Sequence, residues 1–122
     1  MKKILLIFFI LTSFNAFAIE KKTTFNMEDF NSAQKDGKIV VINSWNKSCS
    51  TCGKQVKILD EAKDKFDNII FLSFEQQKDK NVAQFLGIEY WTTIVAYKNN
   101  KEIYRSIGQT NKTKIYSFLE SL

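Results

Sequence analysis

The sequence contains no proline, no histidine and only two cysteines in 122 residues. A structural zinc site needs four ligands, usually cysteine or histidine, so one copy of this chain cannot complete such a site. Without proline, any cis peptide bond would join two non-proline residues and would cost about 2.5–4 kcal/mol. The sequence also lacks basic patches, internal repeats, low-complexity segments and internal linkers. These absences give no reason to expect nucleic-acid binding and favour a single domain.

The first 18 residues have the pattern of a secretory signal peptide. Lys2 and Lys3 precede an apolar run over residues 4–11, and residues 16–18 read Ala-Phe-Ala, a small-x-small cleavage site. The run is shorter than the roughly 20 residues that a membrane-spanning helix needs, and no cysteine at the cleavage site offers a lipid anchor. We therefore expect cleavage after Ala18, export to the periplasm or beyond, and a mature domain of residues 19–122 that does not span a membrane.

Hydrophobic patterning predicts the element order helix, strand, helix, strand, helix, strand, strand, helix. A strand–helix–strand unit gives parallel strands with a right-handed crossover, and Asn99 and Asn100 favour a hairpin because asparagine tolerates positive φ. The expected fold is α/β, a central mixed sheet of four to five strands with helices on both faces; the fifth strand would be a short one at residues 23–25. The expected strands cover residues 38–45, 68–75, 92–98 and 102–107, and the helices residues 27–35, from 49 onward, 80–87 and from 111 onward.

The two cysteines lie three residues apart in the segment VINSWNKSCSTCGKQ, residues 41–55. A disulfide that closes so short a loop restrains the unfolded chain very little, which makes it a poor structural staple. Cys49 falls where a buried strand ends and a helix begins, and the unpaired N–H groups and the helix dipole there favour a thiolate. Lys47 and Lys54 add positive potential. The spacing predicts a redox pair in which Cys49 attacks a disulfide and Cys52, more buried and on the same helix face, resolves the intermediate.

Two other interpretations of the cysteine pair stay open at this point. Four cysteines from two chains could hold a metal ion or an iron–sulfur cluster, in which case the protein would purify coloured and dimeric. Alternatively, the domain is a binding module without redox activity, in which case variants of both cysteines would behave like the original protein.

These segments resemble the thioredoxin superfamily in its small single-domain form. The resemblance covers nearly all of residues 19–122 and depends on VVINSWNKSCSTCGKQ and FLGIEYWTTIVAYKNNKE, with Gly108 before the last helix. It implies a thioredoxin fold and a monomeric, cofactor-free enzyme that exchanges disulfides with protein disulfide or dithiol substrates. The lack of an inserted helical domain favours a reductant over an oxidant. An exported reductant would need a membrane thiol reductase as its electron donor.

The resemblance also implies an active-site environment around the cysteines. Trp45 matches the family's tryptophan beside the site, where we expect it to act as a packed wall. Ser50 and Thr51 form the dipeptide between the cysteines that tunes the redox potential. Asn43 stands where thioredoxins carry a buried aspartate, and Ser73 aligns with their buried lysine. Losing the aspartate and the lysine together is electrostatically consistent, because neither charge is then left buried without its partner.

The largest departure from the family is Thr92, which aligns with the cis-proline beside the active-site loop. We expect Trp91 and Thr92 to lie close to Cys49 and to bind substrate, Trp91 through a flat apolar face and Thr92 through its hydroxyl and backbone. The family's proline is thought to discourage metal binding, so its absence strengthens the cluster alternative. Whether the Trp91–Thr92 peptide is cis does not follow from the sequence.

Overall fold

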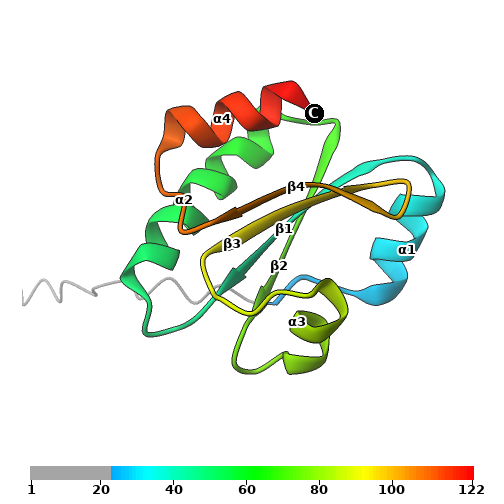
Figure 1. Ribbon diagram of the computed structural model, residues 1–122. Coiled ribbons are helices and arrows are strands. Elements are labelled where there is room, and N and C mark those ends of the chain that lie inside the picture. Colours follow the sequence, from blue (N-terminus) through cyan, green and yellow to red (C-terminus); the bar gives the residue numbers. More distant parts are fainter. Residues whose placement is uncertain (1–22) are drawn as a thin grey trace, which may run out of the picture.

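Residues 23–122 are described by the computed structural model of the protein (Figure 1). The predicted signal peptide, residues 1–18, lies outside the described residues. Within 23–122, no helix combines the length and the apolar character needed to cross a membrane. The elements are α1 (Met27–Lys35), β1 (Ile39–Trp45), α2 (Ser50–Lys65), β2 (Ile69–Glu75), α3 (Lys80–Leu86), β3 (Thr93–Lys98), β4 (Lys101–Ile107) and α4 (Lys112–Ser121).

The four strands form one mixed sheet in the order β2-β1-β3-β4. β1 pairs with β2 in parallel, with Asn43 opposite Ser73. β3 is antiparallel to both β1 and β4. The turn between β3 and β4 places Asn99 at φ 52° and Asn100 at φ 62°. The structure thus confirms the predicted α/β order, the parallel pair and the asparagine hairpin.

Two layers of helices cover the sheet, with α2 and α4 on one face and α1 and α3 on the other (Figure 1). Along β1, Ile39 and Val41 pack with α2 and α4, whereas Val40 and Ile42 pack with α1 and α3. Successive strand residues point to opposite faces, so a strand covered on both sides must be apolar throughout. This arrangement explains the continuous apolar run and makes β1 an interior strand of the sheet.

The predicted fifth strand at residues 23–25 is absent, and the described sheet has four strands. The backbone N–H groups of Thr24 and Phe25 both donate to the carbonyl of Ser73, each at 2.9 Å. The Ser73 N–H donates to Thr24 Oγ1 at 2.9 Å. A β ladder needs successive donors and acceptors to pair with different residues. Here both backbone donors converge on one carbonyl of β2, so the segment covers the sheet edge without extending it.

Candidate active site

Cys49 occupies the N-cap of α2, immediately after the loop that follows β1. Its N–H donates to the carbonyl of Asn46 at 3.2 Å, which turns the chain from strand to helix. Its Sγ accepts a hydrogen bond from the Cys52 N–H at 3.1 Å. The sulfur therefore takes the place that a serine or aspartate oxygen takes at an ordinary N-cap. Negative charge at this position is stabilised by the helix dipole and the free N–H groups.

Cys49 and Cys52 are joined by a disulfide, with their Cα atoms 5.3 Å apart. Cys49 is partly exposed, whereas the Cys52 side chain is buried, with 2% of its surface exposed. An incoming thiolate can therefore reach Cys49 but not Cys52. This difference in access is the one expected for an outer attacking sulfur and an inner resolving sulfur.

Trp45 and Val56 pack around Cys52 from β1 and α2. The Trp45 side chain is 5% exposed, and its Nε1 has no hydrogen-bond partner among residues 23–122. The indole therefore contributes apolar contact, as a wall of the site. By contrast, Ser50 and Thr51 are exposed in the first turn of α2, where they contribute to the surface that a substrate would meet.

Asn43 and Ser73 are register partners on neighbouring strands, and each side chain is 2% exposed. They lie on the sheet face of Trp45, two residues along each strand from the pair formed by Trp45 and Glu75. The positions aligned with the family's buried aspartate and lysine are therefore neighbours here too. Both carry neutral side chains in this protein, so this part of the interior holds no charge at either position. Lys47 and Lys54, expected to add positive potential, are exposed.

Thr92 brings a second loop, residues 88–92, onto the cysteine pair. Its Oγ1 lies 3.0 Å from Cys52 Sγ and 3.4 Å from Cys49 Sγ. The side chain is buried, whereas the preceding Trp91 is 43% exposed and Tyr90 is 60% exposed. The structure therefore places Thr92 in contact with both sulfurs and leaves Trp91 on the surface beside them.

The backbone of Thr92 has φ 64°, and residues 23–122 contain no cis peptide bond. The left-handed region is rare for a β-branched residue. Ser44 on β1 holds this segment: its carbonyl accepts from the Thr92 N–H at 2.9 Å, and its hydroxyl donates to the Tyr90 carbonyl at 2.9 Å. The Thr93 hydroxyl donates to the same Tyr90 carbonyl at 2.7 Å. A strained residue persists where its surroundings fix it, and such residues often lie at functional sites.

Gln55 is a residue of the site that the sequence analysis missed. It is fully buried in α2, and its Nε2 donates to the carbonyls of Thr92 at 3.1 Å and Gln109 at 2.9 Å. The side chain thus links the cysteine helix to the Thr92 loop and to the segment before α4. A signal was available: Gln55 follows Cys52 by three residues, so it falls on the same buried face as Leu59. A polar residue on an apolar stripe calls for a buried partner.

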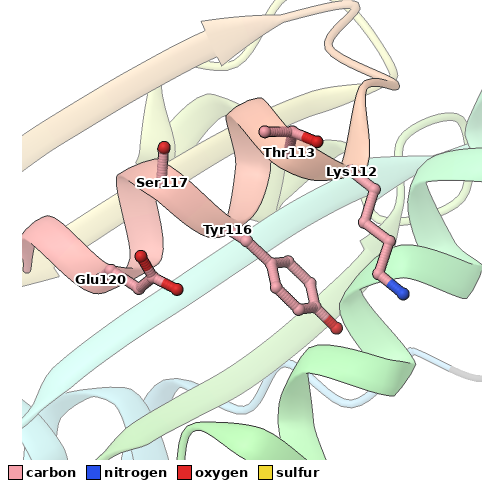
Figure 2. Close-up of a pocket in the computed structure, with 5 residues that line it drawn as sticks. All are labelled: Lys112, Thr113, Tyr116, Ser117 and Glu120. Atoms are coloured by element: carbon pink, nitrogen blue, oxygen red, sulfur yellow. The ribbon is translucent and has the colours of Figure 1, made fainter.

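A hollow of about 280 Å³ on α4 is lined by Lys112, Thr113, Tyr116, Ser117 and Glu120 (Figure 2). All five residues come from one helix, and none contributes to the cysteine site. Lys112 Nζ donates to Glu61 at 3.0 Å, and this hydrogen bond raises the pKa of Lys112. Lys65 pairs with Glu120 at 3.7 Å. We interpret the hollow as a surface depression between side chains that form ion pairs between α4 and α2.

Among residues 23–122, no group of three or more histidine, cysteine or acidic side chains could hold a metal ion. The site brings together the cysteine pair, the buried hydroxyl of Thr92 and the buried amide of Gln55. A mixed sheet between two helical layers, with a Cys-x-x-Cys disulfide at the helix that follows the central strand, defines a thiol–disulfide exchange protein.

The model of the Thioredoxin family matches residues 21–121, so the chain belongs to the thioredoxin family. A thioredoxin of Mycoplasma genitalium is 29% identical over 89 residues, which cover 73% of this chain and 84% of that protein. A thioredoxin of Coprinus comatus is 25% identical over 97 residues, covering 78% and 91%. With its Cys49–Cys52 disulfide, the protein is a thiol–disulfide oxidoreductase.

Solved structures give the same fold. The crystal structure of Trxlp from Edwardsiella tarda has a TM-score of 0.73 at 23% identity, covering 78% of this chain and 94% of that one. A thioredoxin from Malassezia sympodialis has a TM-score of 0.70 at 22% identity, covering 79% and 87%. The expected thioredoxin fold is thereby confirmed.

Proposed function

We propose that the protein is an exported reductant, which reduces the disulfides of periplasmic or secreted proteins with Cys49 as nucleophile and Cys52 as resolving thiol. The observation that carries this proposal is the position of the Cys49 sulfur, which is both the N-cap of α2 and the accessible member of the pair. Helix N-termini lower thiol pKa values, and the thiolate is the reactive form.

The reaction consists of two exchanges. The Cys49 thiolate attacks one sulfur of a substrate disulfide, the substrate S–S bond breaks, and the other substrate sulfur leaves as a thiolate that takes up a proton. Cys52, deprotonated, then attacks Cys49 Sγ, which forms the Cys49–Cys52 disulfide and releases the second substrate thiol. The substrate gains two electrons and two protons, and the protein pair loses them.

The direction of electron flow is supported by the architecture around the pair. A single short helix, α3, connects β2 to β3, so the described domain carries no inserted helical unit. Export is supported by the pattern of residues 1–18. An exported reductant must be reduced again after each cycle, and a membrane thiol reductase is the class of partner that fits. The exposed Trp91 and the strained Thr92 backbone next to the sulfurs are proposed to contact substrate, with the protein acting as a monomer.

The decisive measurement is the reduction potential of the Cys49–Cys52 pair. We expect a value closer to the roughly −270 mV of thioredoxin than to the roughly −120 mV of a strong periplasmic oxidant. A value near the second figure would make the protein an oxidant. Fractionation of cells that express the full chain tests export, since the proposal requires a processed form outside the cytoplasm.

An activity assay tests the assigned roles. The protein should reduce insulin disulfides, and Cys49→Ser should lower that rate to the uncatalysed background because the nucleophile is gone. Ser48→Ala, which changes a neighbouring exposed hydroxyl, is the matched control and should keep the activity. Purification as a coloured dimer with iron and sulfide would contradict the proposal and favour the cluster alternative.

A further inference from the structure

Two of the exchanges at this site place negative charge on a sulfur that water does not reach. When a thiolate attacks Cys49, the Cys49–Cys52 bond breaks and its electron pair stays on Cys52 Sγ. When Cys52 resolves a mixed disulfide, it must first become a thiolate. The Cys52 side chain is 2% exposed, and a buried charge is costly unless a hydrogen-bond donor faces it. The catalytic cycle therefore needs a donor inside the site.

The Thr92 hydroxyl lies within hydrogen-bond distance of this sulfur, with its Oγ1 at 3.0 Å from Cys52 Sγ. The same oxygen lies 3.4 Å from Cys49 Sγ, so one hydroxyl reaches both ends of the disulfide. A threonine hydroxyl has one proton to donate. Hydrogen bonds to an ionised acceptor are about twice as strong as those between neutral groups. The hydroxyl will therefore donate preferentially to whichever sulfur carries the charge.

The fold holds this hydroxyl in place from three sides. The Thr92 N–H donates to Ser44 on β1 at 2.9 Å. Its carbonyl accepts from Gln55 on α2 at 3.1 Å and from the Gly108 N–H at 2.9 Å. These contacts keep a β-branched residue at φ 64°. A hydroxyl fixed before reaction needs little reorganisation when the charge appears, which is the condition for electrostatic catalysis.

We propose that Thr92 is a catalytic residue whose hydroxyl donates a hydrogen bond to the Cys52 sulfur as its thiolate forms, and to the Cys49 sulfur when the charge is there. The hydroxyl keeps its own proton, so it stabilises the charge without entering the proton or electron balance. The two electrons come from the attacking dithiol when the pair is reduced and pass to the substrate disulfide when the pair is oxidised. This role applies to exchange in either direction and does not depend on the proposed function.

Other titratable groups lie around the site, and their effects on the two sulfurs must be distinguished from the effect of the Thr92 hydroxyl. Glu75 on β2 is 9% exposed and lies opposite Trp45 in the sheet register. Tyr90 is exposed in the Thr92 loop, and Lys47 and Lys54 are exposed on either side of the cysteines in the sequence. The test therefore uses a variant that changes no charge and is repeated in a Glu75→Gln background.

The test compares Thr92→Val with Thr92→Ser and with the control Thr113→Val. Dithiothreitol reduces the disulfide of the full chain, and tryptophan fluorescence reports the reaction because Trp45 packs on Cys52. We expect Thr92→Val to slow reduction about tenfold, the lower range for losing a hydrogen bond to a charged group. Thr92→Ser should restore most of the rate. Thr113→Val makes the same chemical change at an exposed residue of α4 that does not contribute to the cysteine site, and it should leave the rate unchanged.

A second measurement separates catalysis from a structural effect. In Cys49→Ser, the only thiol left is Cys52, and its ionisation can be followed by thiolate absorbance. Adding Thr92→Val should lower the acid dissociation constant of Cys52 about tenfold, and the decrease should persist with Glu75→Gln. Thr92→Ala removes the same hydroxyl and replaces Thr92→Val if that variant does not fold.

Three results would overturn the proposal: an unchanged rate and unchanged Cys52 acidity in the variants that lack the Thr92 hydroxyl, equal slowing by Thr113→Val, or an effect that disappears with Glu75→Gln. None of these results bears on the reduction potential or on export. Failure here would therefore leave the proposed function standing, and the reverse also holds.

Discussion

Two loops meet at the sulfur pair, and they obtain their shapes in different ways. The cysteine loop, residues 46–48, connects β1 to α2, and its course follows from local features: a buried strand ends, and Cys49 caps the next helix. The threonine loop, residues 88–92, contains neither proline nor glycine. Its conformation depends on partners distant in sequence, Ser44 and Gln55. The attacking sulfur is therefore positioned by its own segment, whereas the Thr92 hydroxyl that faces it is positioned by contacts with the rest of the fold.

The largest effect is expected from Cys52→Ser, which removes the inner thiol in the first turn of α2 and leaves the cysteine loop unchanged. The mixed disulfide at Cys49 then has no resolving thiol, so insulin reduction should fall to background and substrates should accumulate covalently bound. Non-reducing gels and mass spectrometry of the trapped species provide the measurement. Turnover at the original rate would show that Cys52 is not the resolving thiol.

The threonine loop should be most sensitive to Gln55→Glu, because a carboxylate would then face the carbonyls of Thr92 and Gln109. An uncompensated buried charge costs about 3 kcal/mol or more of the free energy of unfolding at pH 7. Burial and the facing carbonyls would raise the pKa of this carboxyl in the folded state above its unfolded value of about 4.3. The protonated form is therefore favoured by folding, so the loss should be small below about pH 4 and should increase as pH rises.

Urea unfolding at several pH values measures this dependence, and Gln55→Leu is the matched control because it carries no charge. Relative to the original protein, the control should show no pH-dependent change in stability. If Gln55→Glu and Gln55→Leu followed the same pH course, the amide would not be the buried link between α2 and the threonine loop.

The smallest expected effects come from two glycines, of which Gly87 shares the positive φ of Thr92 and Gly53 is helical. Gly87, the C-cap of α3, has φ 62°, and Thr92 has φ 64°. A Cβ at Gly87 would meet only Arg105 Nη2, at 3.9 Å, so Gly87→Ala should cost about 1 kcal/mol for the backbone alone. Gly53→Ala, inside α2 with no atom within 4 Å of its Cβ, should instead stabilise by about 0.5–1 kcal/mol. Thermal or urea unfolding measures both changes in the free energy of unfolding. If both substitutions stabilised or both destabilised the protein, the different backbone requirements of Gly87 and Gly53 would be contradicted.

Local signals explain what the sequence could predict. Asparagine is a favourable N-cap residue, and Asn26 Oδ1 accepts from the Glu28 N–H at 2.8 Å at the start of α1. The buried run became β1, and Cys49 became the start of α2. Each of these depends on neighbours within one turn of helix or along one strand.

What could not be predicted depends on contacts between distant segments. The segment at 23–25 has strand-like residues, but its N–H groups converge on Ser73. The sequence shows Gln55 only as a polar residue in a helix. Its role depends on the carbonyls of Thr92 and Gln109, which the fold brings next to it. The positive φ of Thr92 has no local signal, because threonine rarely adopts it.

The sulfur that caps α2 is also the atom that exchanges bonds, and this double use has a consequence for how the protein can be tuned. The reduction potential of the pair and the stability of the first turn of α2 are coupled, because each chemical state of Cys49 is a different acceptor for the Cys52 N–H. Any change that stabilises this turn when Cys49 is a thiolate stabilises the reduced pair and makes it a weaker reductant. Ser50 and Thr51 lie in that turn and are exposed. Substitutions at these two surface positions can therefore change the reduction potential while the interior of the protein stays the same.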